Sequence, residues 1–227
     1  MKKVACLTIV AGVLVPTNAL AGCRDAPKAG VDWAKCSKQR LVLDQSDLTS
    51  AKFQGAILNG TSFAGSRLPD ARFELSELSR TSFRNANLNN AIFQKAFGMS
   101  TSFVKADLSK AQLNKAEFYR GSFKEATIVS ADLSHGDYPR AVFDGANLTQ
   151  SNLTRANLSR ASFVNATLKG TNFKNAYLYR ATIEGTDLSN AVGLTSEQLE
   201  FTCGNRETKL PADISRPASW PCVRLPE

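Results

Sequence analysis

Apolar residues recur at every fifth position between residues 41 and 190. The third residue of each five-residue block is Leu, Phe, Ile or Tyr except at Gly98, and the first is small except at Leu41. This spacing fits neither the 3.6-residue period of a helix nor the two-residue period of an ordinary strand. It fits a chain that turns about a quarter of a circle per block, so that each third residue points inward. The short fixed period predicts a repeat architecture.

A second period of 20 residues lies above the first. Phe occupies six successive third positions at this spacing: Phe63, Phe83, Phe103, Phe123, Phe143 and Phe163. The recurrence predicts that four blocks make one coil and that coils stack in register. Coils paired at 4.7–4.9 Å would give about 7.5 coils and a rod roughly 36 Å long. One coil cannot bury its apolar residues alone, so the stack needs caps at both ends.

The blocks resemble those of the pentapeptide-repeat family, in which a small residue is followed by Asp or Asn, then Leu or Phe, then two variable residues. Close matches are Ala106–Lys110, Ala131–His135 and Ala156–Arg160. The resemblance covers about two thirds of the chain. It implies an all-β fold, a right-handed quadrilateral β-helix, and the handedness comes from the resemblance alone.

Four segments are expected along the chain: an export signal at 1–22, an N-terminal cap at 23–40, the β-helix at 41–194 and a C-terminal cap at 195–227. The first segment has Lys2 and Lys3, an apolar run too short to span a bilayer, and a cleavage site at Ala19-Leu20-Ala21. It predicts a periplasmic or secreted protein. Removal of the signal lowers the net charge from +8 to +6, because the segment holds two Lys and no acidic residue.

Cysteines cluster near the two ends of the predicted rod. Cleavage after Ala21 leaves four, which predict the disulfides Cys23–Cys36 and Cys203–Cys222 in an oxidising compartment. An alternative stays open, because Leu20-Ala21-Gly22-Cys23 also resembles a lipoprotein box. Lipidation of Cys23 would anchor the chain to a membrane and leave Cys36 unpaired.

The C-terminal segment carries the spacing of a capping box at Thr195-Ser196-Glu197-Gln198. This predicts a short helix at about 196–202, ended by Gly204, and an irregular cap after it. Exported members of the family resemble this C-terminus, with Glu-Gln-Leu, then Cys-Gly, then a Leu-Pro segment.

Residues that could carry chemistry are scarce. His135 is the single histidine and stands at an outward fifth position, where we expect a solvated side chain. There is no Cys-x-x-Cys pair, no second histidine for a zinc site and no Gly-rich phosphate loop. The sequence therefore predicts no cofactor and no enzyme activity.

Basic residues recur at fifth positions and predict an anion-binding edge: Arg80, Lys95, Lys115, Arg120, Arg140, Arg155, Arg160 and Arg180. The alternative is a solvated, salt-bridged edge, because Glu77, Glu117 and Asp137 stand three residues before Arg80, Arg120 and Arg140. The ligand of a true binding edge would be an anionic glycan, a lipid head group or an acidic protein. Nucleic acid is not expected for an exported chain.

Two blocks depart from the pattern. Gly98 supplies no core side chain, which predicts a bulge or bent coil near 96–100 with Phe97 or Met99 filling the gap. Pro139 cannot donate a ladder hydrogen bond, and Tyr138 needs a partner for its hydroxyl if it points inward. We expect a local distortion there, with a recognition site as the alternative.

Two functions follow from these patterns. The first is a non-enzymatic exported scaffold or binding protein of the bacterial cell envelope, with an unknown protein or anionic partner. The second is a DNA mimic that binds gyrase, as the resemblance to quinolone-resistance members of the family implies. A mimic predicts an acidic surface and no export signal, and the basic chain and its signal oppose it. A dimer is compatible with the pattern, but the pattern does not predict one.

Overall fold

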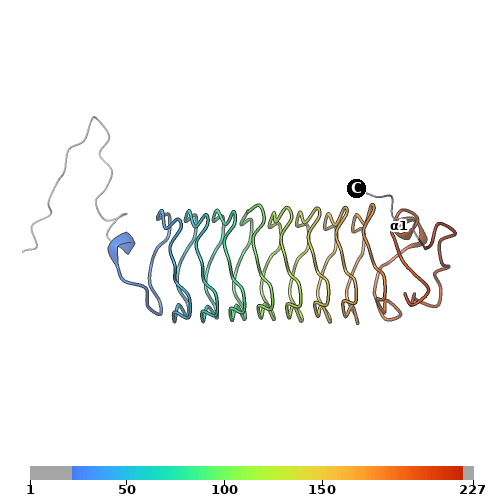
Figure 1. Cartoon of the computed structure of the whole chain (residues 1–227), viewed down its shortest axis with the longest axis horizontal. Helices are drawn as coiled ribbons and strands as arrows, with labels where there is room; N and C mark the ends of the chain where they lie inside the picture. The colour runs from blue at the N-terminus through green and yellow to red at the C-terminus, as the bar shows by residue number, and fades with distance from the viewer. Residues whose placement is uncertain (1–21, 222–227) are drawn as a thin grey trace, which may run out of the picture.

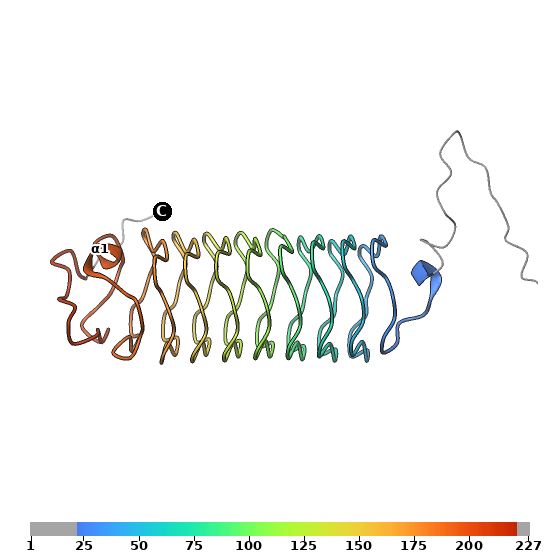
Figure 2. The same cartoon turned by 180° about the vertical axis from the view of Figure 1, so that it is seen from behind.

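The computed structural model describes residues 22–221, and within them the chain coils into a rod (Figure 1). Parallel bridges join residue i to residue i+20 without interruption, from Asp32↔Lys52 to Asn172↔Val192. Each coil therefore contains four bridged segments separated by turns. The helices are short: η2 at Gly22–Arg24 and α1 at Ser196–Leu199. Figure 2 shows the same stack from behind, with α1 in the cap at one end.

One backbone hydrogen bond closes each turn between residues 28 and 191 except those before Leu41 and Thr101. The amide of a first-position residue donates to the carbonyl of the third-position residue before it, as from Ala56 to Phe53 at 3.0 Å. Every fifth-position residue from 30 to 185 has a positive φ, between 53° and 60° where it is not glycine. A positive φ at the third residue of a turn is the mark of a type II turn. Non-glycine residues adopt it at a cost of about 1 kcal/mol each, which the ladder offsets.

The ladder uses the other amides in a fixed way. The second-position amide donates to the preceding coil, as from Lys52 to the Val31 carbonyl at 2.8 Å. The third-position amide donates to the following coil, as from Trp33 to the Lys52 carbonyl at 2.8 Å. The fifth-position amide also donates forward, and the fourth takes no part in the ladder. Pro69 and Pro139 both stand at fourth positions, where proline loses no bond.

The expected distortion at Tyr138 and Pro139 is therefore wrong. The bridges Glu117↔Asp137 and Asp137↔Asn157 keep the 20-residue register. Tyr138 is fully buried, and its hydroxyl donates to the Leu113 carbonyl at 2.9 Å. Burial, followed by the nearby charges of Asp132 and Asp137, raises the pKa of Tyr138 well above its ordinary value.

Gly98 also keeps the register, so the expected bulge is wrong. The alternative, a bent coil, is confirmed, because residues 99 and 100 form a bend in place of the usual turn. Phe97 and Met99 do not fill the gap, because they are 43% and 47% exposed. The backbone itself closes the space: a Cβ on Gly98 would lie 2.8 Å from the Leu78 carbonyl. Buried Thr101 donates its hydroxyl to that same carbonyl at 2.8 Å.

Third-position side chains form one continuous core. The predicted Phe column stacks in register, with Phe63 and Phe83 at 5.1 Å between ring centroids and 2° between planes. A neighbouring column stacks as closely, with Phe73 and Phe93 at 4.7 Å. These distances match the spacing of paired strands, so the ladder and the ring stacking reinforce each other.

The rod starts at Asp32, nine residues before the expected start at 41, so residues 31–40 are not part of an N-terminal cap. The third positions of these two blocks hold Trp33, which is buried, and Lys38, whose Nζ lies 3.9 Å from the centroid of the Trp33 ring. Block 36–40 does not follow the apolar period, because lysine occupies its inward third position. The predicted disulfide Cys23–Cys36 is confirmed and ties η2 to the first coil.

The C-terminal cap is more regular than expected. The predicted capping box of α1 is present, with Thr195 and Gln198 as its partners, although α1 ends at Leu199. Beyond it, Thr182↔Cys203 and Asp187↔Lys209 extend the ladder at spacings of 21 and 22 residues, so the cap continues the sheet. Cys203 is disulfide-bonded, while its predicted partner Cys222 and residues 1–21 of the predicted signal lie outside the described residues.

Gly136 supports the buried tyrosine and provides a test of the packing. A Cβ at this position would lie 2.6 Å from Cζ of the Tyr138 ring. We expect Gly136→Ala to lower the free energy of unfolding by about 1–3 kcal/mol through overpacking. Tyr138→Leu in the same chain should relieve most of this loss, because it restores the Ala-x-Leu pattern of block 156–160. Denaturant unfolding of the single and double variants measures both effects, and equal losses with and without Tyr138 would contradict the contact.

Candidate binding face

One stack of segments carries most of the exposed apolar side chains. We call it the aromatic face and define it by segments 56–60, 76–80, 96–100, 116–120, 136–140, 156–160 and 176–180. Ten large hydrophobic residues are exposed among the described residues, and six of them belong to this face: Phe97, Met99, Tyr119, Tyr177, Tyr179 and Phe201. Phe201 lies outside these ranges but occupies the equivalent place in the next coil. Its carbonyl accepts from the Arg180 amide at 2.8 Å, and in the regular coils a fifth-position amide donates in this way to the fourth-position carbonyl of the next coil.

These six residues form two clusters. The central cluster, Phe97, Met99 and Tyr119, lines a shallow hollow of about 240 Å³ together with Gly98 and Pro139. The terminal cluster consists of Tyr177, Tyr179 and Phe201. In it the two tyrosine rings stack at 6.0 Å between centroids, and Phe201 lies 5.9 Å from Tyr179. An exposed apolar concentration of this kind on a soluble surface indicates an interaction site.

The eight predicted basic residues border this face in two rows, so the expectation of a single edge is wrong. Fifth positions lie in the turns at the corners of the coil, and the turn before the aromatic face and the turn after it are separated by the width of one segment. The leading row stands before the face and contains Lys95, Lys115 and Arg155. The trailing row stands after it and contains Arg80, Arg120, Arg140, Arg160 and Arg180. All eight are exposed.

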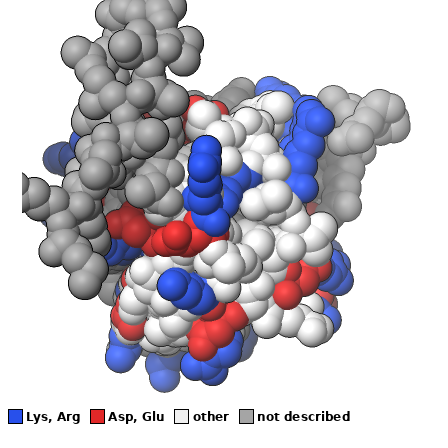
Figure 3. All heavy atoms as spheres, turned by 90° about the vertical axis from the view of Figure 1, so that its left-hand side faces the viewer, with Lys and Arg blue, Asp and Glu red and all other residues white. Residues whose placement is uncertain are grey.

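Neither row is neutralised in the way the salt-bridged alternative requires. The five ion pairs found among residues 22–221 involve none of the eight basic residues. Glu77 accepts instead from Asn59 Nδ2 at 3.2 Å, and Asp137 accepts from Asn157 Nδ2 at 2.6 Å. Arg120 and Arg180 lie over the neighbouring rings of Tyr119 and Tyr179, at 5.3 Å and 5.5 Å. Figure 3, a view from the N-terminal end, shows Lys and Arg side chains projecting from the rim of the rod.

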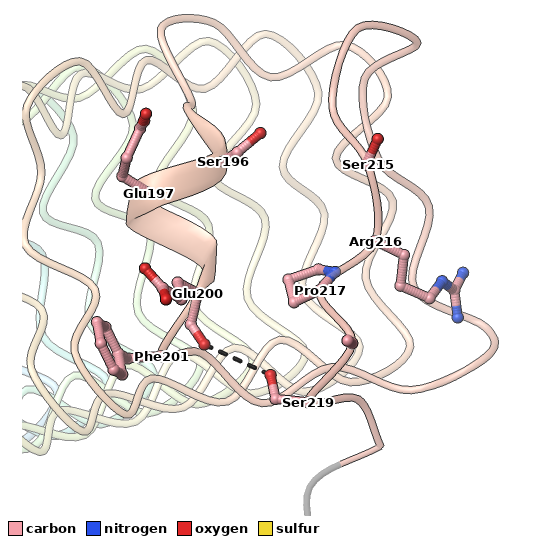
Figure 4. A pocket seen from close by; sticks show the side chains of 9 residues that line it. Ser196, Glu197, Glu200, Phe201, Ser215, Arg216, Pro217 and Ser219 are labelled. Atoms are coloured by element: carbon pink, nitrogen blue, oxygen red, sulfur yellow. Dashed lines mark hydrogen bonds between the residues drawn. The ribbon is translucent and has the colours of Figure 1, made fainter.

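A second hollow lies in the C-terminal cap (Figure 4). Its volume is about 650 Å³, and α1 and segment 215–219 line it from opposite sides. Glu197, Glu200 and Phe201 contribute side chains, and Ser219 Oγ donates to the Glu200 carbonyl at 3.4 Å. Sequence reasoning missed this hollow because its walls come from two segments with no shared pattern. Phe201 connects it to the terminal cluster.

The described residues contain no arrangement suited to a metal: no three His, Cys, Asp or Glu side chains lie close enough to hold an ion. His135 is exposed on the leading row. Helices within 22–221 all fall short of the length and hydrophobicity that a membrane crossing requires.

The model of the family described as pentapeptide repeats matches this chain in eight copies, which cover 39–65, 46–85, 56–94, 81–119, 128–163 and 156–192. The chain belongs to the pentapeptide-repeat family. The sequence-based assignment is thereby confirmed, and the family identifies the rod of this pentapeptide-repeat protein as a right-handed β-helix solenoid. No curated protein sequence matches.

This chain is also similar to solved structures. HetL, involved in heterocyst differentiation regulation in the cyanobacterium Nostoc sp. strain PCC 7120, is 24% identical with a TM-score of 0.49, over 82% of this chain and 85% of HetL. Full-length QnrB1, a plasmid-mediated fluoroquinolone resistance protein, is 14% identical with a TM-score of 0.47, over 80% and 91%. A protein from the Arabidopsis thaliana thylakoid lumen is 24% identical with a TM-score of 0.23, over 73% and 86%.

The trailing row gives a test of its unbalanced charge. Arg140 stands between Arg120 and Arg160 in neighbouring coils, so like charges face each other at about 4.8 Å between backbones. Arg140→Asn removes one charge and introduces a residue that tolerates positive φ. Lys110→Asn is the matched control, because Lys110 has the same φ sign but stands between Asn90 and Ser130.

At low salt we expect the Arg140 variant to raise Tm by about 1 °C more than the control. The difference should shrink at 0.5 M NaCl, because salt screens repulsion between exposed charges. Thermal unfolding followed by circular dichroism measures it. Equal shifts for the two variants at both salt concentrations would show that the row carries no repulsion.

Proposed function

We propose that this pentapeptide-repeat protein is a non-enzymatic binding rod of the bacterial cell envelope, and that its aromatic face binds an anionic partner between the two basic rows. The observation that carries the proposal is a coincidence in space. Among residues 22–221, six of the ten exposed large hydrophobic residues lie on the same face that eight cations without an ion-pair partner border. Aromatic residues and arginine dominate the energetic centres of protein interfaces.

The rod geometry supports binding without rearrangement. Four bridged segments per 20 residues favour a quadrilateral cross-section, and the uninterrupted ladder from Asp32 to Val192 corresponds to about eight coils. The segments of the aromatic face from 56–60 to 156–160 are held by bridges to both neighbouring coils, and segment 176–180 is held by a bridge to 156–160. Exposed side chains on such a scaffold lose little backbone entropy when a partner binds.

Binding rather than catalysis is proposed because reactive groups do not converge within residues 22–221. His135 and the carboxylates of the aromatic face make no hydrogen bond with one another. Family membership adds support, because a repeat fold of this kind presents long surfaces more readily than enclosed sites. Gyrase binding by DNA mimicry is less well supported, since a mimic needs an acidic surface and this chain carries a net charge of +8.

Export is the second part of the proposal. The Cys23–Cys36 disulfide supports an oxidising compartment, and it occupies the sulfur that lipidation would use. We expect mass spectrometry of the protein from its native host to show a chain that begins at Gly22 with Cys23 linked to Cys36. A diacylglyceryl group on Cys23 would replace soluble export with a membrane anchor, and an intact N-terminus in the cytosolic fraction would contradict export.

Recovery of partners from envelope extract tests the binding face. In one variant Arg120, Arg140, Arg160 and Arg180 become Glu; in the control, four exposed cations away from the face do: Arg84, Lys110, Lys124 and Lys169. Both variants change the net charge equally. We expect the first to recover at least about tenfold less of the bound partner, because it reverses the trailing row, while the control matches wild type. Equal recovery by both variants, with folding verified by circular dichroism, would contradict the proposed face.

A further inference from the structure

We propose that the partner segment bound by the aromatic face is an acidic amphipathic α-helix that lies along the rod axis between the leading and trailing rows. This inference rests on the proposed function, since it names what the same face binds. It follows from the width of the face, the spacing of its two clusters and the positive charge of the two rows that border it.

The width of the face matches a helix. The bridged part of each segment consists of three residues before the turn, which at about 3.3 Å each span about 10 Å between the two rows. An α-helix with its side chains is about 10–12 Å across. The Arg and Lys side chains of the two rows would then flank a helix on both sides, while Phe97 and Tyr177, at bridged second positions, lie beneath its centre and Tyr119 and Tyr179 lie toward the trailing row.

The two clusters set the positions of the apolar anchors. Three to four coils separate Phe97 and Tyr119 from Tyr177 and Tyr179, a distance of about 14–19 Å at the spacing of paired strands. A helix covers this distance with about 10–13 residues. Between the clusters, Asp137 and Asn157 are hydrogen-bonded to each other. The partner helix therefore needs two apolar groups about three turns apart, with a polar stretch between them.

The charges of the borders set the flanks of the helix. All eight residues of the two rows are cations without an ion-pair partner among the described residues. Carboxylates at positions on both sides of an apolar stripe would meet both rows at once. Arginine pairs well with carboxylates because its planar guanidinium donates two parallel hydrogen bonds.

The same borders disfavour a second copy of this chain. If two aromatic faces met with their rods parallel about a two-fold axis, the leading row of one copy would oppose the trailing row of the other. If the rods were antiparallel, each row would oppose itself. Both arrangements place cations against cations, which opposes association.

An anionic glycan fits less well than a helix. Glu117 and Asp137 lie on the face between the two rows, and Glu197 and Glu200 line the hollow that includes Phe201. These carboxylates would repel sulfate or uronate groups that pass along the middle of the face. A helix avoids this repulsion because its acidic residues project sideways toward the rows.

The test uses the rod from residue 22 to 227 with its disulfides intact and three fluorescein-labelled 25-residue peptides. The first has Leu at helical spacing on one stripe and Glu on both flanks; the second has Lys in place of Glu; the third is a scrambled form of the first. Fluorescence anisotropy measures binding at 50 mM salt. We expect the acidic helix to bind, the Lys peptide not to bind, and the scrambled peptide to bind at least about tenfold more weakly.

Variants of the rod locate the binding. Tyr119→Ala and Tyr179→Ala should each weaken the acidic helix about tenfold, whereas Val42→Ala and Val192→Ala, at exposed apolar positions on other faces, should not change its affinity. The inference is overturned if the acidic helix does not bind, if the scrambled peptide binds equally, or if the tyrosine variants bind like wild type. Displacement of the helix by heparin with the same tyrosine dependence, or dimers of the rod in sedimentation that the tyrosine variants abolish, would assign the face to a glycan or a second copy instead.

The outcome separates the two proposals. Loss of the envelope partner on reversal of the trailing row, together with failure of the acidic helix to bind, would leave the binding face in place and overturn only the helix. Unchanged recovery of partners in that variant would overturn the proposed face itself, whatever the peptide does.

Discussion

The hydrogen bond that closes the regular corners of the rod governs the rest of this structure. It runs from a first-position amide to the third-position carbonyl before it, as from Ala56 to Phe53 at 3.0 Å. Closing the corner holds the fifth residue at positive φ and directs the next segment along a new side of the coil. The third residue then points inward, the second and fourth point outward, and the fifth stands on a corner. Every side chain therefore has its place in the rod assigned by its position within a 20-residue coil.

This assignment separates core from surface more completely than in an ordinary globular domain. Core residues such as Phe83 and Leu88 contact other third-position residues, and the outward residues contribute little to that packing. The exposed rings of Tyr177 and Tyr179 are not required by the core, which is already closed beneath them by Leu178. Apolar side chains that the core does not need, gathered on one face, indicate a surface built for contact.

The sequence predicted the repeated part of the fold because one period governs both packing and hydrogen bonding. The sequence-based prediction failed where a residue interrupted the apolar period while the coil continued. Lys38 at an inward position concealed the first two blocks. Phe201 was not placed on the aromatic face because its coil is two residues longer at that point: the Arg180 amide donates 21 residues ahead instead of 19. Pro139 looked disruptive because a general rule about proline in sheets was applied to a position whose amide the ladder does not use. The division of the basic residues into two rows was missed because it depends on where the corners lie in space.

The departures from the repeat and the exposed aromatic residues share one stack of segments, and the core explains why. Where Gly98 replaces a core side chain, the backbone lies so close to Leu78 that a Cβ would be 2.8 Å from its carbonyl. Phe97 and Met99 flank that glycine and point outward, where they wall the 240 Å³ hollow with Tyr119. Two coils beyond Gly98, Gly136 makes room for the ring of Tyr138, and Pro139 completes the rim of the same hollow. The residues that interrupt the inner pattern thus shape the outer surface. The register of the ladder is unchanged, so the hollow forms without loss of ladder hydrogen bonds, although the corner bond from Thr101 to Gly98 is missing there.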